Sequence, residues 1–212
     1  MIQVKQIETG AINENCYIIY NNTEALIVDP GAETNKIKKE LDNLNVTPLA
    51  VILTHTHYDH IGALEDIRTD YAIPVYVSAK EQDWLGDPSL NLSTYTNFDL
   101  RANPAEYTFD LSESVTIGPF SFDVVATPGH SPGGVSFIFK EAACVFSGDA
   151  LFKGSIGRTD LPGSESEKLI PAVEEMLFVL PDDYTVYPGH NDSTTIGYEK
   201  QTNPYFRKRK DS

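Results

Sequence analysis

The sequence is poor in cysteine and has no long apolar run. Its two cysteines, Cys16 and Cys144, both lie inside apolar stretches and form no Cys-x-x-Cys pair. We therefore expect both to be reduced and buried, as in a protein of the cytoplasm. No apolar run approaches the roughly 18 residues that a membrane helix needs, and the first residues show no basic segment followed by an apolar core. Neither secretion nor membrane insertion is predicted.

Basic residues are also scarce. The chain has 16 Lys and Arg against 31 Asp and Glu, a net charge of −15. Affinity for nucleic acid depends largely on counterions released by basic side chains, so this balance argues against a nucleic-acid partner. The basic cluster at residues 207–210 is more typical of a solvated tail. A length of 212 residues is enough to bury a core without disulfides, and we expect one domain over residues 1–212.

Histidine is equally rare, but its five occurrences are not scattered. Three of them, His55, His57 and His60, share a loop with Asp59 directly after the apolar run 49–53, which predicts a buried strand. Five random histidines would rarely give this spacing, so a simple polar turn is a poor explanation. Imidazole nitrogens and carboxylate oxygens are ligands that zinc, iron and manganese accept. The spacing predicts a metal site and suggests two ions.

The remaining two histidines share one sequence pattern. His130 and His190 each follow Pro-Gly at the end of an apolar run, and no histidine is left over. The run 145–148 likewise ends on a turn, where it presents Asp149 instead. We therefore add His130, Asp149 and His190 to the candidate metal ligands.

Apolar periodicity predicts a mixed α/β chain. The first half predicts strands at 2–7, 16–20, 25–28, 49–53 and 74–77, with helices at 32–44 and 62–68. The second half predicts strands at 115–117, 120–126, 135–139, 143–146 and 184–187, with helices at 167–180 and 194–201. Residues 81–112 have no clear pattern and contain several aromatic residues. A segment of this kind favours a lid over the site, with packing of its aromatics on the sheet as the alternative.

The pattern His55-x-His57-x-Asp59-His60, followed by His130, Asp149 and His190, resembles the metallo-β-lactamase superfamily over nearly the whole chain. The resemblance implies a four-layer αβ/βα sandwich, with which the two halves of strands followed by helices agree. It also implies one metal on His55, His57 and His130, a second on Asp59, His60 and His190, and Asp149 bridging them. Asp29 would orient the metal loop or would simply be a turn residue.

Such a pair would hold two divalent metal ions per chain, for which zinc is the expected element and iron or manganese the alternatives. Two metals lower the pKa of a water between them and polarise a carbonyl, so no serine or cysteine nucleophile is needed. Asp59 could orient the resulting hydroxide as well as bind metal.

The branch of the superfamily follows from further residues. His57 is not a glutamate, which argues against the flavodiiron proteins, and Asp149 is not a cysteine, which argues against the class B β-lactamases. The stretch 154–162 and the residues after His190 resemble short, single-domain glyoxalase II-like hydrolases, which hydrolyse small-molecule thioesters such as S-lactoylglutathione. Arg158 stands where those enzymes place a basic substrate contact. Its alternative role is an ion pair with Asp160 that stiffens the loop.

Glutathione as the thiol carrier is less firmly implied, because the tyrosines that glyoxalase II enzymes use near this site are replaced here. Two other functions also fit the sequence. A persulfide dioxygenase shares the Gly-Arg-Thr-Asp stretch and uses a single iron bound by two histidines and one aspartate. A metal-binding protein without turnover would need only the ligands.

Overall fold

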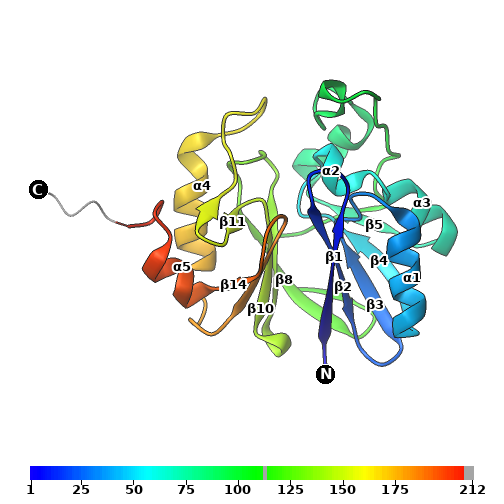
Figure 1. The fold of residues 1–212 in the computed structure, drawn as a ribbon, viewed down its shortest axis with the longest axis horizontal. Coiled ribbons are helices and arrows are strands. Elements are labelled where there is room, and N and C mark those ends of the chain that lie inside the picture. Colours follow the sequence, from blue (N-terminus) through cyan, green and yellow to red (C-terminus); the bar gives the residue numbers. More distant parts are fainter. Residues whose placement is uncertain (112–113, 208–212) are drawn as a thin grey trace, which may run out of the picture.

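The computed structural model describes residues 1–111 and 114–207, and its first half forms a six-stranded sheet in the order β1-β2-β3-β4-β5-β6 (Figure 1). The first three strands form an antiparallel meander, and the strands from β3 to β6 run parallel to one another. The strands are β1 (Gln3–Thr9), β2 (Glu14–Tyr20), β3 (Glu24–Val28), β4 (Thr47–Ile52), β5 (Val75–Val77) and β6 (Tyr107–Thr108).

The second half forms another six-stranded sheet in the order β14-β13-β10-β9-β8-β7. Its one parallel pair is β10 with β13, and its other pairs are antiparallel. The strands are β7 (Ser114–Ile117), β8 (Phe120–Ala126), β9 (Val135–Phe139), β10 (Cys144–Gly148), β13 (Thr185–Pro188) and β14 (Thr194–Thr195). A small separate hairpin pairs β11 (Leu151–Phe152) with β12 (Ser155–Ile156).

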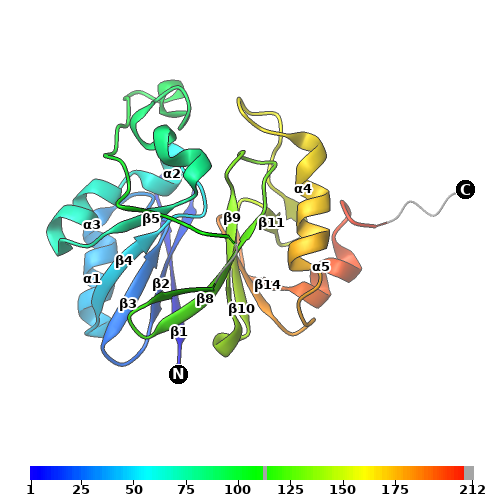
Figure 2. The same ribbon diagram turned by 180° about the vertical axis from the view of Figure 1, so that it is seen from behind.

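Helices cover the outer face of each sheet, as the two opposite views show (Figures 1 and 2). Helices α1 (Thr34–Leu44) and α3 (Leu64–Tyr71) cover the first sheet, and α4 (Ser166–Ala172) and α5 (Ile196–Thr202) cover the second. A single helical turn, α2 (Tyr58–Ile61), lies near one edge of the molecule. The expected four-layer αβ/βα sandwich is confirmed.

Three apolar cores hold the layers together. The central core lies between the sheets and is rich in aromatic side chains, among them Phe122, Phe137 and Phe139, whose rings contact one another. One outer core joins α1 and α3 to the first sheet through residues such as Ile37 and Ile67, and the other lies beneath α4 and α5. Both faces of each sheet are therefore covered, which explains why runs such as that of β4 are apolar without alternation.

The predicted elements are present, with differences at some ends. The helix expected at 167–180 is α4, Ser166–Ala172, followed by a wider π-type turn at Val173–Leu177. Pro171 lies inside α4 and has no backbone N–H to donate, which weakens regular α-helical bonding around it. The helix expected at 194–201 begins only at Ile196, because Thr195 belongs to β14 and its side chain caps the helix. Neither α2 nor the β11–β12 hairpin was predicted.

The irregular segment 81–112 divides between the two roles expected of it. Leu92 and Tyr95 line the largest cavity of the site, whereas Tyr107 stacks on the sheet residue Tyr76 and Phe109 contacts Phe137. Movement of this segment as a lid stays a prediction.

Other expectations concern single features. Cys16 and Cys144 are free and buried, as predicted. Within the described ranges, no helix is long and apolar enough to cross a membrane. Residues 208–210 of the basic cluster lie outside the described residues.

Candidate metal centre

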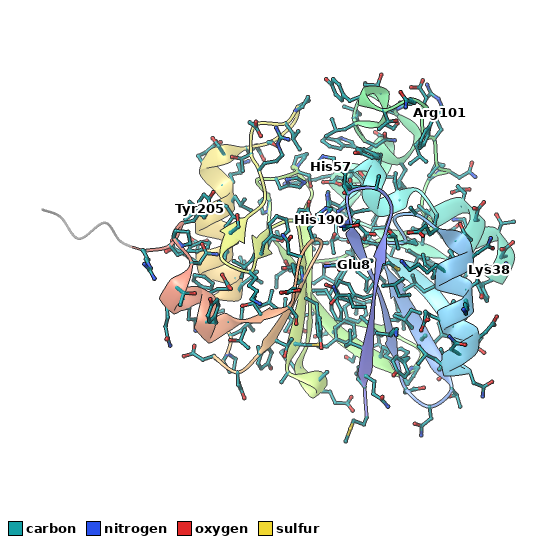
Figure 3. All side chains as sticks on the ribbon, viewed as in Figure 1. Glu8, Lys38, His57, Arg101, His190 and Tyr205 are labelled. Atoms are coloured by element: carbon teal, nitrogen blue, oxygen red, sulfur yellow. The ribbon has the colours of Figure 1, made fainter. Side chains whose placement is uncertain are left out.

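The predicted ligands all follow strands that end at the same edge of the sandwich. His55 and His57 come after β4, His130 after β8, Asp149 after β10 and His190 after β13. Figure 3 shows His57 and His190 close to the line where the two halves of the molecule meet. The fold therefore joins at one point side chains that are up to 135 positions apart in the chain.

The first cluster consists of His55, His57 and His130, whose candidate ligand nitrogens lie within 4.8 Å of one another. Nδ1 of His57 lies 2.9 Å from Nε2 of His130. Burial lowers the pKa of His55 well below its ordinary value, and burial together with His130 lowers the pKa of His57 to about 3. Both rings are therefore neutral at neutral pH, which is the form that binds a metal.

The second cluster consists of Asp59, His60 and His190, again within 4.8 Å. Oδ2 of Asp59 lies 3.4 Å from Nε2 of His60 and 3.1 Å from Nε2 of His190. Burial alone would lower the pKa of His60, but the carboxylates of Asp59 and Asp149 outweigh it and raise that pKa well above its ordinary value.

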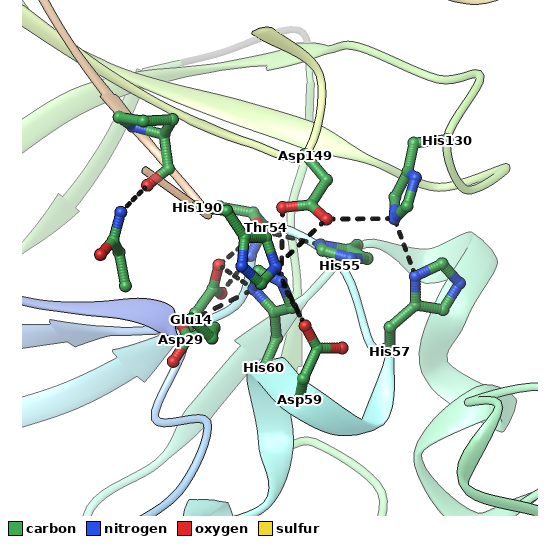
Figure 4. Close-up of polar contacts among 12 residues, drawn as sticks. Glu14, Asp29, Thr54, His55, His57, Asp59, His60, His130, Asp149 and His190 are labelled. Atoms are coloured by element: carbon green, nitrogen blue, oxygen red, sulfur yellow. Dashed lines mark hydrogen bonds and ion pairs between the residues drawn. The ribbon is translucent and has the colours of Figure 1, made fainter. Parts of the chain in front are cut away.

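Asp149 lies between the clusters and contacts both (Figure 4). Its Oδ2 is 3.3 Å from Nε2 of His130 and 3.7 Å from Nε2 of His190, and its Oδ1 is 3.4 Å from Nε2 of His60. Burial would raise the pKa of this carboxyl, but His60 and His130 hold it well below its ordinary value. Asp149 is thus an ionised carboxylate placed to bridge two cations.

The polar atoms of the clusters indicate that cations belong there. Nε2 of His55, His57 and His60 and Oδ1 of Asp149 are buried and have no hydrogen-bond partner within the described part of the chain. Buried polar atoms are normally paired, and an unpaired one costs about 1 to 3 kcal/mol. A nitrogen and carboxylate donor set with unpaired atoms is what a divalent metal would satisfy.

Asp29 holds the histidine loop in place. Its buried carboxylate accepts hydrogen bonds from the backbone nitrogen and the hydroxyl of Thr54, at 2.8 and 2.5 Å, and from Nδ1 of His60 at 3.0 Å. The Thr54 hydroxyl also lies 3.1 Å from Nδ1 of His55. These contacts engage Nδ1 of both rings and turn Nε2 to the clusters. Distances alone would also allow an ion among Asp29, His55 and His60, but three donors already engage Asp29.

Comparison with known proteins decides the family. The model of the metallo-β-lactamase superfamily matches residues 9–190. The chain belongs to this superfamily. The probable metallo-hydrolase YqgX of Bacillus subtilis is 42% identical over 203 residues, covering 95% of this chain and 96% of that protein. Hydroxyacylglutathione hydrolase GloC of Haemophilus influenzae is 31% identical over 209 residues, covering 97% and 98%.

Solved structures agree with the fold, and one of them contains metal. The BLEG-1 B3 metallo-β-lactamase matches with a TM-score of 0.94 and 44% identity, covering 97% of this chain and all of that one. TTHA1623 in a di-iron-bound form matches with a TM-score of 0.84 and 34% identity, covering 95% and 99%. Superfamily membership and the two His/Asp clusters together point to divalent metal binding.

Two glycines of this superfamily member allow its ligands to converge. A side chain at Gly189 would collide with Oδ1 of Asp149 and with the His60 ring, so only glycine fits between them. Gly129 has a φ of 137° and lies against the backbone of Leu169. The glycine before each of these two histidines is therefore a steric requirement of the site.

The clusters open into a cavity of about 530 Å³. Arg158 lies on its wall next to the first cluster, because Nδ1 of His130 donates to the backbone oxygen of Arg158 at 2.8 Å. The exposed guanidinium forms two hydrogen bonds with Asp160, at 2.7 and 2.9 Å. The ion pair considered from the sequence is thus present, and Arg158 also lines the cavity.

Glu81 was missed by sequence reasoning, because nothing in its neighbourhood departs from an ordinary surface pattern. It is fully buried and accepts hydrogen bonds from the backbone nitrogen and hydroxyl of Thr56, at 2.7 and 2.9 Å. Its other oxygen accepts from the Ser131 hydroxyl at 2.5 Å and from the Gly133 backbone at 2.9 Å. Thr56 lies between two ligands and Ser131 follows a third, so Glu81 ties together both parts of the first cluster.

Glu14 was missed for a similar reason, since the polar run before Cys16 gave no signal. Its side chain is buried, accepts a hydrogen bond from Thr9 at 2.6 Å and has one oxygen 3.8 Å from Nδ1 of His60. Burial raises the pKa of this carboxyl well above its ordinary value, although His60 opposes the shift. Its backbone pairs with that of His190, which joins the two sheets beneath the second cluster.

Removing one ligand from each cluster should separate the two metals. We expect His130→Ala and His190→Ala each to retain about one metal per chain after dialysis, where the wild type retains about two. Metal analysis by mass spectrometry measures the ratio. Asp192→Ala, which removes a carboxylate that is 81% exposed, is the control and should keep both metals. Full retention in either histidine variant would remove that residue from the ligand set.

Glu81→Gln should weaken the first cluster in particular. The amide nitrogen of glutamine would face donors on one side, so we expect a loss of about 2 to 4 kcal/mol in unfolding free energy and partial loss of one metal. The matched control is Glu199→Gln, because Glu199 is equally buried and accepts hydrogen bonds from Thr194, Gly154 and Asn203 away from the ligands. The control should lose comparable stability yet keep its metals. Equal metal loss in both variants would show that Glu81 acts only through general stability.

Proposed function

We propose that this protein is a dinuclear metal-dependent hydrolase that acts on small-molecule thioesters. The observation that carries the proposal is the placement of Asp149 between two complete clusters at the floor of one cavity. Relatives named metallo-hydrolase and hydroxyacylglutathione hydrolase support hydrolysis and, more specifically, a thioester. The two free, buried cysteines support a location in the cytoplasm, which we also propose.

The seven ligands predicted from the sequence would hold the two metals. When bound, such a pair supplies a water of lowered pKa and a positive charge that stabilises the oxyanion formed from a carbonyl. Hydrolysis adds the water oxygen to the carbonyl carbon and breaks the bond from that carbon to sulfur. One proton of the water goes to the leaving sulfur and the other is released, giving a carboxylate, a thiol and a proton. Asp59 lies at the cavity wall, where its second oxygen could orient the attacking water.

The identity of the metal is part of the proposal. We propose zinc, which suits this nitrogen and carboxylate donor set, with iron as the alternative supported by the di-iron-bound neighbour. Zinc and iron can both bind this donor set, so metal analysis must distinguish them.

The test combines metal analysis with two assays. Protein purified without oxygen should contain about two metals per chain and should hydrolyse a thioester, and Asp149→Ala should lower the rate at least about 100-fold. Circular dichroism checks that the variant is folded. One iron per chain with oxygen uptake on a persulfide would replace this proposal with the dioxygenase. Stable metal binding with neither reaction would indicate a binding protein.

A β-lactam is the second candidate substrate. The observation that favours it is the match to the BLEG-1 B3 metallo-β-lactamase, at 44% identity over its whole chain. This match runs against the sequence argument that Asp149, in place of a cysteine, disfavours the class B β-lactamases. An amide carbonyl in a strained ring needs the same attack on carbon. Comparing kcat/KM for a chromogenic cephalosporin and for a thioester ranks the two substrate classes.

Arg158 is the proposed contact for a carboxylate on the thiol carrier. Asp160 engages Nε and Nη2 of the guanidinium, which leaves Nη1 to face a ligand in the cavity. We expect Arg158→Ala to lower kcat/KM about 10- to 100-fold for a thioester with a carboxylated carrier, mainly through KM, and to change it little for a neutral one. Steady-state kinetics on the matched substrate pair measures this difference.

Asp160→Asn is the companion variant for that measurement. It weakens the ion pair but keeps the arginine, so it should retain or improve activity on the carboxylated substrate. Equal losses on both substrates in both variants would instead make the pair a stiffener of the loop.

A further inference from the structure

The cavity wall differs beside His130 and beside His190, and we call these parts the His130 end and the His190 end. Arg158 lies next to His130, whose ring donates to its backbone oxygen. Two apolar side chains from separate hairpins, Ile12 and Phe152, line the cavity beside His190, and Ile156 of the second hairpin also lines the cavity. Asp149 lies between the two ends, because its carboxylate contacts both His130 and His190.

Phe152 and Ile12 are both tied to His190. The Phe152 ring stands perpendicular to the His190 ring, with 6.0 Å between their centres. Ile12 lies in the turn between β1 and β2, two residues before Glu14, whose backbone pairs with that of His190. The next residue, Asn15, donates its backbone N–H to the oxygen of Gly189 at 2.7 Å and its side chain to the oxygen of Asn191 at 2.8 Å.

The hairpin that carries Phe152 and Ile156 is held as firmly. Buried Glu199 accepts a hydrogen bond from the backbone nitrogen of Gly154 at 2.9 Å. Buried Asn203 donates to the backbone oxygen of Ser155 at 3.0 Å. The apolar wall is therefore built in advance of any ligand, which reduces the entropy lost on binding.

Charge at the His190 end is already paired. Lys153, beside Phe152, forms an ion pair with Asp192 at 3.2 Å. Ile12 nevertheless exposes 51% of its surface toward solvent and cavity. An apolar group of a ligand that covered Ile12 and Phe152 would remove this surface from water. It would not need to remove water from an unpaired charge.

We infer that the His190 end binds an apolar acyl chain, so that the preferred substrates are thioesters of unbranched aliphatic acids longer than acetate. The inference rests on the proposed hydrolysis. A carbonyl carbon placed over Asp149 puts the thiol carrier toward Arg158 and the acyl group against Ile12 and Phe152. The apolar side chains would thus select the acyl group, and Arg158 would select the thiol carrier.

The experiment uses the metal-loaded protein and a series of thioesters of one small neutral thiol, from acetyl to hexanoyl. We expect kcat/KM to rise about two- to fourfold per methylene over the first members, as burial of each group contributes to binding. Ile12→Ser and Phe152→Ser should each flatten this dependence. Val179→Ser, which changes a side chain that is 72% exposed and does not line the cavity, should leave the dependence unchanged.

Metal content and circular dichroism are measured on every variant. If Phe152→Ser fails to fold, the result for Ile12→Ser, which lies at an exposed turn, decides whether the acyl site exists. A flat dependence in the wild type, with thioesters hydrolysed, would overturn the acyl site and leave the proposed function standing. If no thioester is hydrolysed, the proposed function fails. Calorimetric binding of acetate, butanoate and hexanoate then decides the acyl site: affinity that rises with chain length and falls in Ile12→Ser supports it, and equal affinities overturn it.

Discussion

The convergence of unpaired ligand atoms on one buried point is the constraint on which the rest of the structure depends. Five imidazoles and two carboxylates meet at the edge of the sandwich, and Nε2 of His55, His57 and His60 has no hydrogen-bond partner among the residues that the structure describes. A protein gains nothing from such an arrangement by itself, because buried polar atoms without partners are destabilising. Divalent cations bound at this edge would satisfy these atoms. Metal binding would therefore add to the stability of the folded state, because the two are thermodynamically linked.

Three buried carboxylates outside the ligand set make the convergence stable. Asp29 is hydrogen-bonded by the loop that carries His55 and His60, Glu81 joins that loop to the one after His130, and Glu199 holds the β11–β12 hairpin at the cavity. Each accepts at least three hydrogen bonds, from side chains and from at least one backbone N–H. Irregular loops would otherwise be the most mobile part of the fold. The hydrogen bonds to these carboxylates hold the loops in place where the positions of the candidate ligands and the cavity wall must be fixed.

The sequence predicted the strands and helices of the layers well, and it picked out candidate ligands that the fold brings together, because both leave local patterns. Apolar runs mark strands such as β4, and Pro-Gly before His190 marks a turn where no side chain fits beside Asp149. Glu81 left no comparable signal, since its four donors come from Thr56, Ser131 and Gly133, as many as 52 positions away. The π-type turn after α4 depends on how the helix packs as well as on Pro171. Hydrogen-bond partners that are distant in the sequence meet only once the chain is folded. They leave no local pattern from which a single sequence could predict them.

The role of Arg158 could not be decided from local sequence patterns. The sequence offered a substrate contact and an ion pair with Asp160 as alternatives, whereas the fold places the paired guanidinium on the cavity wall, where the two are compatible. Under the proposed function, bound metals would activate water toward any carbonyl that reaches them, so the pair of clusters would set the reaction class and leave the substrate open. Selection must come from the walls, which differ in kind at the His130 and His190 ends. If the proposed function holds, specificity would be a property of two short hairpins and one loop, which can vary without disturbing the candidate ligands they surround.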